Sequence, residues 1–191
     1  MSNVIYLTLT GERQGEISAG CGTEKSIGNR FQYRHENEIL VYQLSSSSVS
    51  TAGGVYHQGL RFIKPTDKSS PLLTTAINEN EKLRLSFDYY RTNRFGRQEK
   101  YYHIELRGAS IQGISSSHKK DSLDTESITV SYEYIRSKHL IANTEFSNLL
   151  LPDAYNQLFP ADEIKQPEKR NITLTLGVFF DGTGNNAVNT Q

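Results

Sequence analysis

The sequence has little of three things that would each point to a function: cysteine, net charge and long hydrophobic runs. Cys21 is the single cysteine among 191 residues, so the chain can form no internal disulfide and no zinc site built from several cysteines, and we expect an unreactive thiol. Lysine and arginine together number 21, as do aspartate and glutamate, which leaves no net charge. Binding to nucleic acid or to a membrane surface usually needs an excess of positive charge, so neither partner is expected.

Hydrophobic runs long enough for a membrane are missing. A membrane-spanning helix needs about 20 consecutive apolar residues, and the sequence contains no such run. Residues 1–14 have only a short apolar patch with no positive charge before it, unlike a secretory signal peptide. We therefore expect no membrane insertion, and an export route without a signal peptide if the protein leaves the cell.

Patterns typical of catalysis or metal binding are also missing. The five histidines do not show the short spacings of metal ligands. The pentapeptide Gly-x-Ser-x-Gly, which presents the nucleophilic serine of α/β-hydrolases, does not occur. We therefore expect no catalytic residues, no metal and no cofactor, so that the chain itself is not an enzyme.

What the sequence does contain is alternation of apolar and polar residues at the period of a β-strand. Leu83, Leu85 and Phe87 point to one side of such a segment, which continues to a polar turn at residues 93–96. Similar segments are expected at residues 3–10, 15–19, 38–44, 60–65, 99–106, 109–115 and 127–136. The pattern predicts a mainly β protein, an antiparallel β-barrel or sandwich with one short α-helix, followed by a largely irregular C-terminal tail.

The expected helix follows the strand at residues 60–65. Ser70 and Pro71 fit an N-cap and a first helical position, because proline lacks the N–H that a helix start leaves unused. The apolar residues after them fall on one side of a helix that should end at residues 78–80. A single helix of this length would cover one opening of a barrel.

Two other segments have unusual composition. Residues 89–102, YYRTNRFGRQEKYY, mix arginine with aromatics and could form a nucleic-acid-binding hairpin, but zero net charge and the polar turn favour a β-hairpin with packed tyrosines. Residues 45–54, SSSSVSTAGG, are small and uncharged, as in an extended surface loop.

Four segments carry a family resemblance: NVIYLTLTGERQGEISAGCG, LRFIKPTDKSSPLL, YYHIELRGASIQGIS and ESITVSYEYIRSKH. Together they resemble the haemolysin-coregulated protein (Hcp) family, the tube protein of the bacterial type VI secretion system. The resemblance covers residues 1–140 and implies a small β-barrel that forms homo-hexameric rings. It also implies that the rings stack into a hollow tube carrying effector cargo, with a spike protein at the tip and a contractile sheath outside.

The resemblance assigns a place and a role to parts of the chain. The protein would wait in the bacterial cytoplasm and then be driven outside the cell or into a target cell. The loop at residues 45–54 corresponds to the family's extended loop, which reaches toward the neighbouring ring. Its candidate ring-stacking residues are Ser46, Ser48, Ser50, Gly53 and Gly54.

The sequence changes after residue 140. Residues 141–171 contain three prolines and a charged run, which predicts a linker. Residues 172–191 begin with ITLTLGVFFDGTGNN, an apolar strand closed by a glycine-rich turn. A phosphate-binding loop is excluded because Asn185 stands where lysine is required, and an aspartyl-phosphate phosphatase because its nucleophile would fall at Phe179.

A third class fits the motif better. GVFFDGTGNN resembles the opening strand and turn of α/β-hydrolase-type lipase effectors, several of which are exported by type VI systems. The residues of the motif are Asp181, Gly182, Thr183, Gly184 and Asn185. We therefore expect residues 172–191 to be the first strand and turn of a truncated effector domain. Two functions stay open: a structural tube protein with a toxin stub, or the export module of a phospholipase or esterase effector whose catalytic body is missing from this chain.

Overall fold

The computed structural model describes residues 3–31, 33–51, 54–118, 120, 122–150 and 158–159. All of them belong to one compact unit, Met1–Pro160, which is separate from the unit Ala161–Gln191. The expected linker end at residue 171 and the expected effector segment 172–191 lie outside the described residues.

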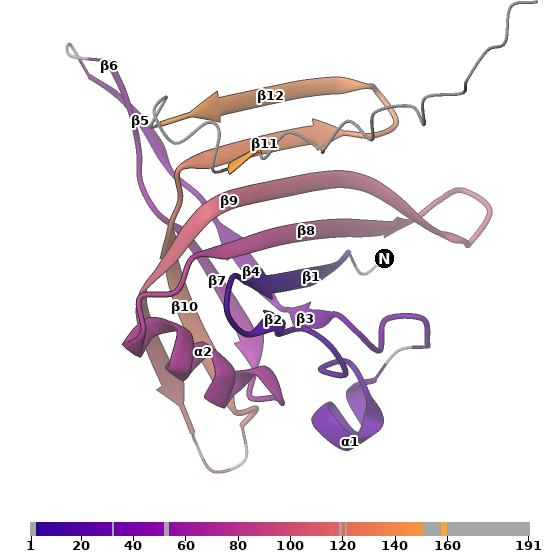
Figure 1. Cartoon of the computed structure of the whole chain (residues 1–191). Coiled ribbons are helices and arrows are strands. Elements are labelled where there is room, and N and C mark those ends of the chain that lie inside the picture. The colour runs from indigo at the N-terminus through magenta and orange to yellow at the C-terminus, as the bar shows by residue number, and fades with distance from the viewer. Residues whose placement is uncertain are drawn as a thin grey trace, which may run out of the picture. The chain divides into compact units, whose positions relative to one another are not determined.

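The described unit is built mainly from antiparallel strands, as the alternation predicts (Figure 1). The strands are β1 (Val4–Gly11), β2 (Gly15–Glu16), β3 (Ile39–Val41), β4 (Gln43–Ser45), β5 (Ser48–Thr51), β6 (Gly54–His57), β7 (Leu60–Pro65), β8 (Leu83–Thr92), β9 (Gln98–Ser117), β10 (Thr125–Ser131), β11 (Tyr134–His139) and β12 (Thr144–Leu149). The helices are α1 (Glu24–Ile27), the 3-10 turn η1 (Gly28–Arg30) and α2 (Ser69–Asn78). The four-residue helix α1 falls in a region expected to be irregular, so the expected single helix is joined by a second, shorter one.

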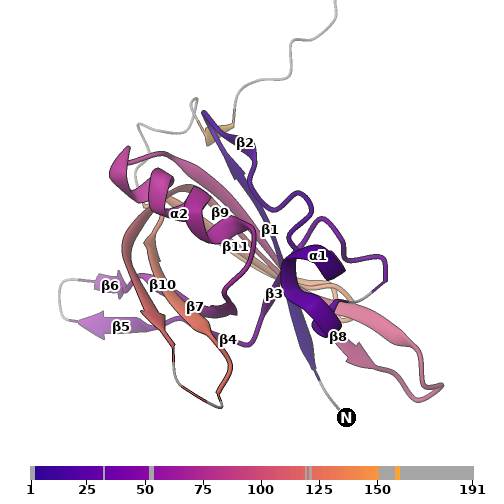
Figure 2. The same cartoon turned by 90° about the horizontal axis from the view of Figure 1, so that it is seen from below.

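The sheet closes into a barrel. Strand β1 pairs with β8, β8 with β9, β9 with β10 and β10 with β7. Strands β3 and β4 follow one another across Tyr42, and β3 pairs with β1 while β4 pairs with β7. The segment β3–β4 therefore joins β1 to β7, the two ends of this series of paired strands. Helix α2 lies across one end of the barrel (Figure 2).

The barrel interior holds the core because alternate residues of each strand point inward. Leu7 and Leu9 of β1, Leu85 of β8 and Ile128 of β10 are completely buried. Phe62 and Phe87 meet there edge to face, with 5.5 Å between ring centroids. The period of two in the sequence therefore predicts the inward side of these strands correctly.

Strand β9 differs from the prediction of two strands separated by Gly108. It is one strand of 20 residues, and Gly108 lies in a β-bulge rather than in a break. Leu83 pairs with Ala109 and Leu85 with Leu106, so Arg107 and Gly108 together oppose one residue of β8. Gly108 has a φ of +58°, a conformation that glycine adopts without strain.

The expected strand at residues 127–136 is divided in two for the same reason. Strand β10 pairs with the second half of β9, and β11 pairs with the first half. The interruption at Tyr132 and Glu133 lies opposite the bulge, where the Glu133 N–H donates to the Arg107 carbonyl at 3.2 Å. The bulge in one strand therefore requires an irregularity in its partner.

Strand β12 lies in the range expected to be a linker. It pairs with β11 from Thr144 to Leu149, which extends the sheet beyond residue 140 (Figure 1). The turn before it contains Asn143 at a φ of +52°, a conformation that asparagine tolerates better than most residues. The hairpin forms because β11 offers an edge that already belongs to the sheet.

Candidate assembly site

The segment expected to stack rings is a hairpin that projects from the barrel. Strands β5 and β6 pair only with each other among the described residues, and together they extend the path of β4 and β7 (Figure 1). The Gln58 N–H donates to the Ser47 carbonyl at 2.9 Å, which closes the base of the hairpin. The predicted loop is thus an ordered two-stranded element over most of its length.

The structure places four of the five predicted stacking residues on this hairpin. Ser46 precedes β5, Ser48 and Ser50 lie on one face of β5, and Gly54 begins β6, whereas Gly53 lies outside the described residues. Residues 46–50 are all exposed, and Val49 among them is a 43 % exposed apolar side chain. The hairpin therefore presents an uncharged surface along β5.

The base of the hairpin is tied to the barrel wall. The Ser45 hydroxyl donates to the Arg61 carbonyl at 3.3 Å, and Arg61 Nε donates to the Ser127 hydroxyl on β10 at 2.6 Å. These bonds link β4, β7 and β10 at the point where the hairpin begins. The projecting strands therefore start from a fixed base.

Strand β7, which leads away from the hairpin, carries a lysine into the barrel. Leu60, Phe62 and Lys64 alternate along β7, and all three are completely buried. Glu126 of β10 lies directly opposite Lys64 in the strand register and is also buried. A buried ammonium is tolerated only with compensating charges and hydrogen bonds, and this register supplies the first of them.

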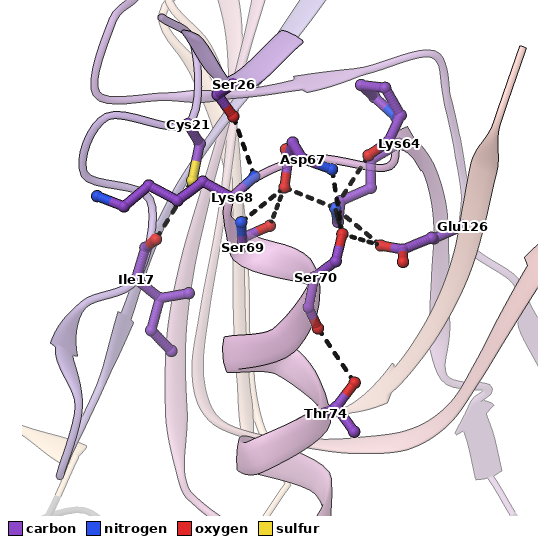
Figure 3. A network of polar contacts seen from close by, with 11 residues as sticks. Ile17, Cys21, Ser26, Lys64, Asp67, Lys68, Ser69, Ser70, Thr74 and Glu126 are labelled. Carbon is purple, nitrogen blue, oxygen red and sulfur yellow. Dashed lines mark hydrogen bonds and ion pairs between the residues drawn. The ribbon is translucent and has the colours of Figure 1, made fainter.

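The lysine joins two strands to helix α2 (Figure 3). Lys64 Nζ lies 2.9 Å from Glu126 Oε2 and 2.8 Å from Asp67 Oδ1. It also donates to the Pro65 carbonyl at 3.0 Å and to the Ser70 hydroxyl at 3.2 Å. The Ser70 hydroxyl in turn donates to Glu126 at 2.8 Å, which closes the network.

The same network starts helix α2 at Ser69, two residues before the predicted first helical residue, Pro71. Asp67 Oδ1 accepts hydrogen bonds from the Ser69 N–H at 2.8 Å and the Ser69 hydroxyl at 2.5 Å. The Ser70 hydroxyl accepts from the Asp67 N–H at 3.1 Å. Asp67 therefore satisfies the helix start that we expected Ser70 to cap, and Ser70 supports Asp67 instead. Pro71 still falls in the first turn.

The segment before α2 is also held from the α1 region. The Lys68 N–H donates to the Ser26 hydroxyl at 3.0 Å (Figure 3). Lys68 Nζ donates to the Ala19 carbonyl at 2.8 Å. Cys21 is buried nearby, with its thiol 3.4 Å from the Ile17 carbonyl. Burial raises the pKa of the Cys21 thiol to about 11, which agrees with the unreactive thiol expected from the sequence.

The hairpin of β8 and β9 has the packed tyrosines expected from its sequence. Tyr89 and Tyr102 meet edge to face with centroids 5.4 Å apart. Arg91 pairs with Glu99 at 2.8 Å and places its guanidinium 5.0 Å from the centre of the Tyr101 ring. The arginine charge on this hairpin is thus partly matched within the hairpin itself.

Two half-buried histidines, His35 and His103, each contact a carboxylate. His35 stacks on Tyr6 at 3.7 Å and lies 2.5 Å from Glu38. His103 lies 2.5 Å from Asp88; burial alone would raise the pKa of Asp88, but hydrogen bonds from His103 and Lys100 hold it below its usual value.

The described residues offer neither a cluster of metal ligands nor a membrane-spanning helix. They contain no group of three or more histidine, cysteine, aspartate or glutamate side chains placed to hold a metal ion. They also contain no helix long and apolar enough to cross a membrane. The predicted effector motif, Asp181 to Asn185, lies outside the described residues and stays a prediction.

Comparisons with known proteins agree with the barrel. The family described as "Type VI secretion system effector, Hcp" matches residues 6–139. The solved structure of the secreted protein Hcp3 from Pseudomonas aeruginosa has a TM-score of 0.73 at 30% identity, covering 78% of this chain and 99% of that chain. The "Major exported protein" of P. aeruginosa is 34% identical over 123 residues, which are 60% of this chain and 72% of that protein.

A longer relative matches more of the chain. The "Uncharacterized protein YhhZ" of Escherichia coli K12 is 53% identical over 174 residues, which are 91% of this chain and 44% of that protein. The chain thus spans less than half the length of this relative. The family match includes both β7 and β10, whose Lys64 and Glu126 hold helix α2 across the barrel end. The chain belongs to the Hcp family of type VI secretion tube proteins.

Proposed function

We propose that this chain is a structural tube subunit that assembles into homo-hexameric rings, which stack and carry effector cargo. The β5–β6 hairpin is the observation that carries the proposal. It extends beyond the barrel, pairs with no other described strand, and has a base fixed by Ser45 and Arg61. A projecting element on a rigid base can reach a neighbouring subunit without distorting the barrel.

The chemistry of the hairpin suits a repeated contact. Residues 46–50 carry four serines and Val49 with no charge, so bringing two such surfaces together buries no unpaired ion. The serine hydroxyls both donate and accept hydrogen bonds, which lets identical surfaces pair. We therefore assign Ser46, Ser48, Ser50, Gly53 and Gly54 to ring stacking.

Deleting residues 46–54 tests the assignment. The deletion should leave the number of subunits in the ring unchanged, because no residue of the barrel wall is removed, and should prevent growth into tubes. Ring mass is measured by light scattering after size exclusion, and tube length by electron microscopy. Unchanged tubes in the deletion would contradict the role of the hairpin.

Val49 lies on the face of β5 opposite to Ser48 and Ser50, and a matched pair of variants there tests whether this second face also takes part in stacking. Val49→Asp places a charge on every copy of the contact, and stacking would bring like charges together, so tubes should shorten or disappear. Val49→Ser keeps the surface uncharged and should stack far better than the aspartate variant. Equal tube lengths for the two variants would show that this face of β5 takes no part in stacking.

The other partners follow from the proposed tube. A contractile sheath would surround it and a spike protein would stand at its tip. The subunit would wait in the bacterial cytoplasm until it is driven outside or into a target cell. Detection of the protein in culture medium only when the sheath genes are intact would support this route, and detection without them would contradict it.

We also propose a role for the end of the chain. Residues 172–191 would be the first strand and turn of a lipase-type effector domain, preceded by a linker that ends at residue 171. The similarity to YhhZ supports an extension that the two proteins share. It covers 174 residues, whereas only 139 residues of this chain lie up to the end of the Hcp match. The similarity therefore includes part of the chain after residue 139. More than half of YhhZ lies outside the similarity.

On the alternative function, the chain is the export module of a phospholipase or esterase whose catalytic body lies elsewhere. An esterase assay separates the two proposals. The 191-residue chain should show no hydrolysis above a heat-denatured sample, because it has no Gly-x-Ser-x-Gly. A longer protein that continues from residue 191 should hydrolyse esters under the alternative, and an inactive longer protein would contradict it.

A further inference from the structure

The bulge in β9 creates a contact site for two residues far along the chain. Arg107 Nη1 donates to the Leu158 carbonyl at 2.9 Å. The Arg107 guanidinium lies 4.3 Å from the centre of the Phe159 ring, and Phe159 meets Tyr134 edge to face at 4.8 Å. One arginine thus contacts both members of the Leu158–Phe159 pair.

Arg107 is also held in position by a carboxylate of the barrel. Its Nε donates to Glu105 Oε1 at 2.9 Å, and the Glu105 side chain is only 7 % exposed. Arg84 holds the same carboxylate with bonds of 3.0 and 2.6 Å. A guanidinium fixed by a buried carboxylate loses less conformational entropy on binding than a free one.

Gly108 provides the room for Leu158. A Cβ at position 108 would come within 2.8 Å of Leu158 Cδ2 and within 2.5 Å of Glu133 Oε2. No other amino acid could therefore lie here without displacing both neighbours, in addition to the strain of a positive φ. The bulge thus orients Arg107 toward the pair and leaves space beside it.

Leu158 itself lines a small hollow beside the bulge. With Leu158 in place the hollow has a volume of about 170 Å³, and its other lining residues include Gly11 of β1, Leu83 of β8 and Lys82 just before β8. Ligand pockets usually measure about 300–1,000 Å³. The space left beside Leu158 is therefore too small for an ordinary ligand, and the Leu158 side chain is the group that covers this surface.

We propose that Arg107, Gly108 and Tyr134 form a docking site for an aliphatic–aromatic dipeptide, whose occupant is Leu158–Phe159 of the same chain. The site is a latch. It fixes the point on the barrel from which the chain continues, so that any extension leaves every copy of the barrel at the same place. The proposal does not depend on ring formation or on the identity of the extension.

The absence of tryptophan from the sequence makes a direct test possible. Phe159→Trp introduces a single fluorophore at the latch of the full chain. Docking should give blue-shifted emission and protection from acrylamide quenching. Leu158→Asp in this background should shift the emission to that of exposed tryptophan, and it should leave the barrel folded because Leu158 lies outside every strand. Exposed emission in Phe159→Trp itself would overturn the proposal.

Substitutions in the barrel test which of its residues form the docking site. Arg107→Ala in the Phe159→Trp chain removes a charged hydrogen bond and a cation–π contact, so the docked-to-free ratio should fall at least about tenfold. Arg91→Ala is the matched control, because it removes a similar arginine–tyrosine contact from β8 and should leave the emission unchanged. Equal emission in the Arg107→Ala and parent chains would overturn the assignment.

Dilution separates docking within a chain from docking between copies. Emission of the Phe159→Trp chain should be independent of protein concentration, since the occupant and the site belong to one molecule. A red shift on dilution would mean that a neighbouring copy supplies the pair, and would overturn the intramolecular latch.

Discussion

Replacing Lys64 by methionine should destabilise the barrel far more than replacing an exposed lysine. The Lys64 side chain is 0 % exposed and forms ion pairs with both Asp67 and Glu126, whose side chains are 0 % and 8 % exposed. Methionine has a similar length but no charge, so the variant fills the space and leaves two buried carboxylates without their cation. The pairs are lost, whereas the packing is largely kept.

The expected loss is large compared with the stability of a domain. Removing one partner of a buried ion pair costs about 3–5 kcal/mol, because the remaining charge stays away from water. Domains unfold with about 5–15 kcal/mol, so this loss is a large fraction of the total. With a urea dependence of about 1–3 kcal/mol per molar, the unfolding midpoint should fall by roughly 1–5 M.

Urea unfolding of the full chain, followed by far-ultraviolet circular dichroism, measures the effect. Lys68→Met is the matched control, because Lys68 is exposed and makes one side-chain bond to Ala19, so its loss should cost less than about 1.5 kcal/mol. Adding Glu126→Gln to Lys64→Met removes one stranded charge and should recover part of the loss. A Lys64→Met chain as stable as Lys68→Met would refute the reasoning.

Three further predictions concern other sites. Burial alone would raise the pKa of Glu105, but hydrogen bonds and charge from Arg107 and Arg84 hold it below its usual value. As the pH falls, Glu105 therefore takes up its proton in the unfolded chain before it does so in the folded chain. The free energy of unfolding should decrease as the pH falls below about 4.5, and it should decrease less steeply in Glu105→Gln. Gly108→Ala should cost about 1–3 kcal/mol in urea unfolding, whereas Gly113→Ala, with nothing within 4 Å, should be neutral or stabilising; equal effects would contradict the bulge argument. Cys21 should react with a thiol reagent only slowly in the native protein and rapidly in denaturant, and rapid native reaction would contradict its burial.

Local patterns in the sequence predict the inward faces of the strands well. Leu60, Phe62 and Lys64 alternate, so the same pattern that buries two apolar residues also places a lysine in the barrel. The pattern does not name its partners, because Glu126 is 62 positions away and meets Lys64 only through the register of β7 and β10. The segments that carry the family resemblance supply both residues of this pair.

Features that depend on tertiary pairing were harder to predict. A glycine between two alternating segments is equally compatible with a break and with a bulge, and only the pairing of β8 with β9 shows the bulge at Gly108. Strand β12 had a usable signal, since Asn143 can form the turn and residues 144–149 follow it without proline or glycine. Helix α1 has four residues, too few for a hydrophobic period to be visible.

The docking of Leu158 and Phe159 had no local signal. An apolar pair next to a proline is common in linkers, and its partner Arg107 lies about 50 positions earlier in the sequence. Its position depends on a bulge and on a buried carboxylate, both of which arise only when the sheet has formed.

The mass of the purified 191-residue chain, measured by light scattering after size exclusion, tests the central claim most directly. We expect a particle of six subunits of 21.6 kDa each. The same particle should form when the chain ends after β12. A monomer at every concentration, for a chain whose circular dichroism shows folded β-structure, would contradict the ring on which the proposed function depends.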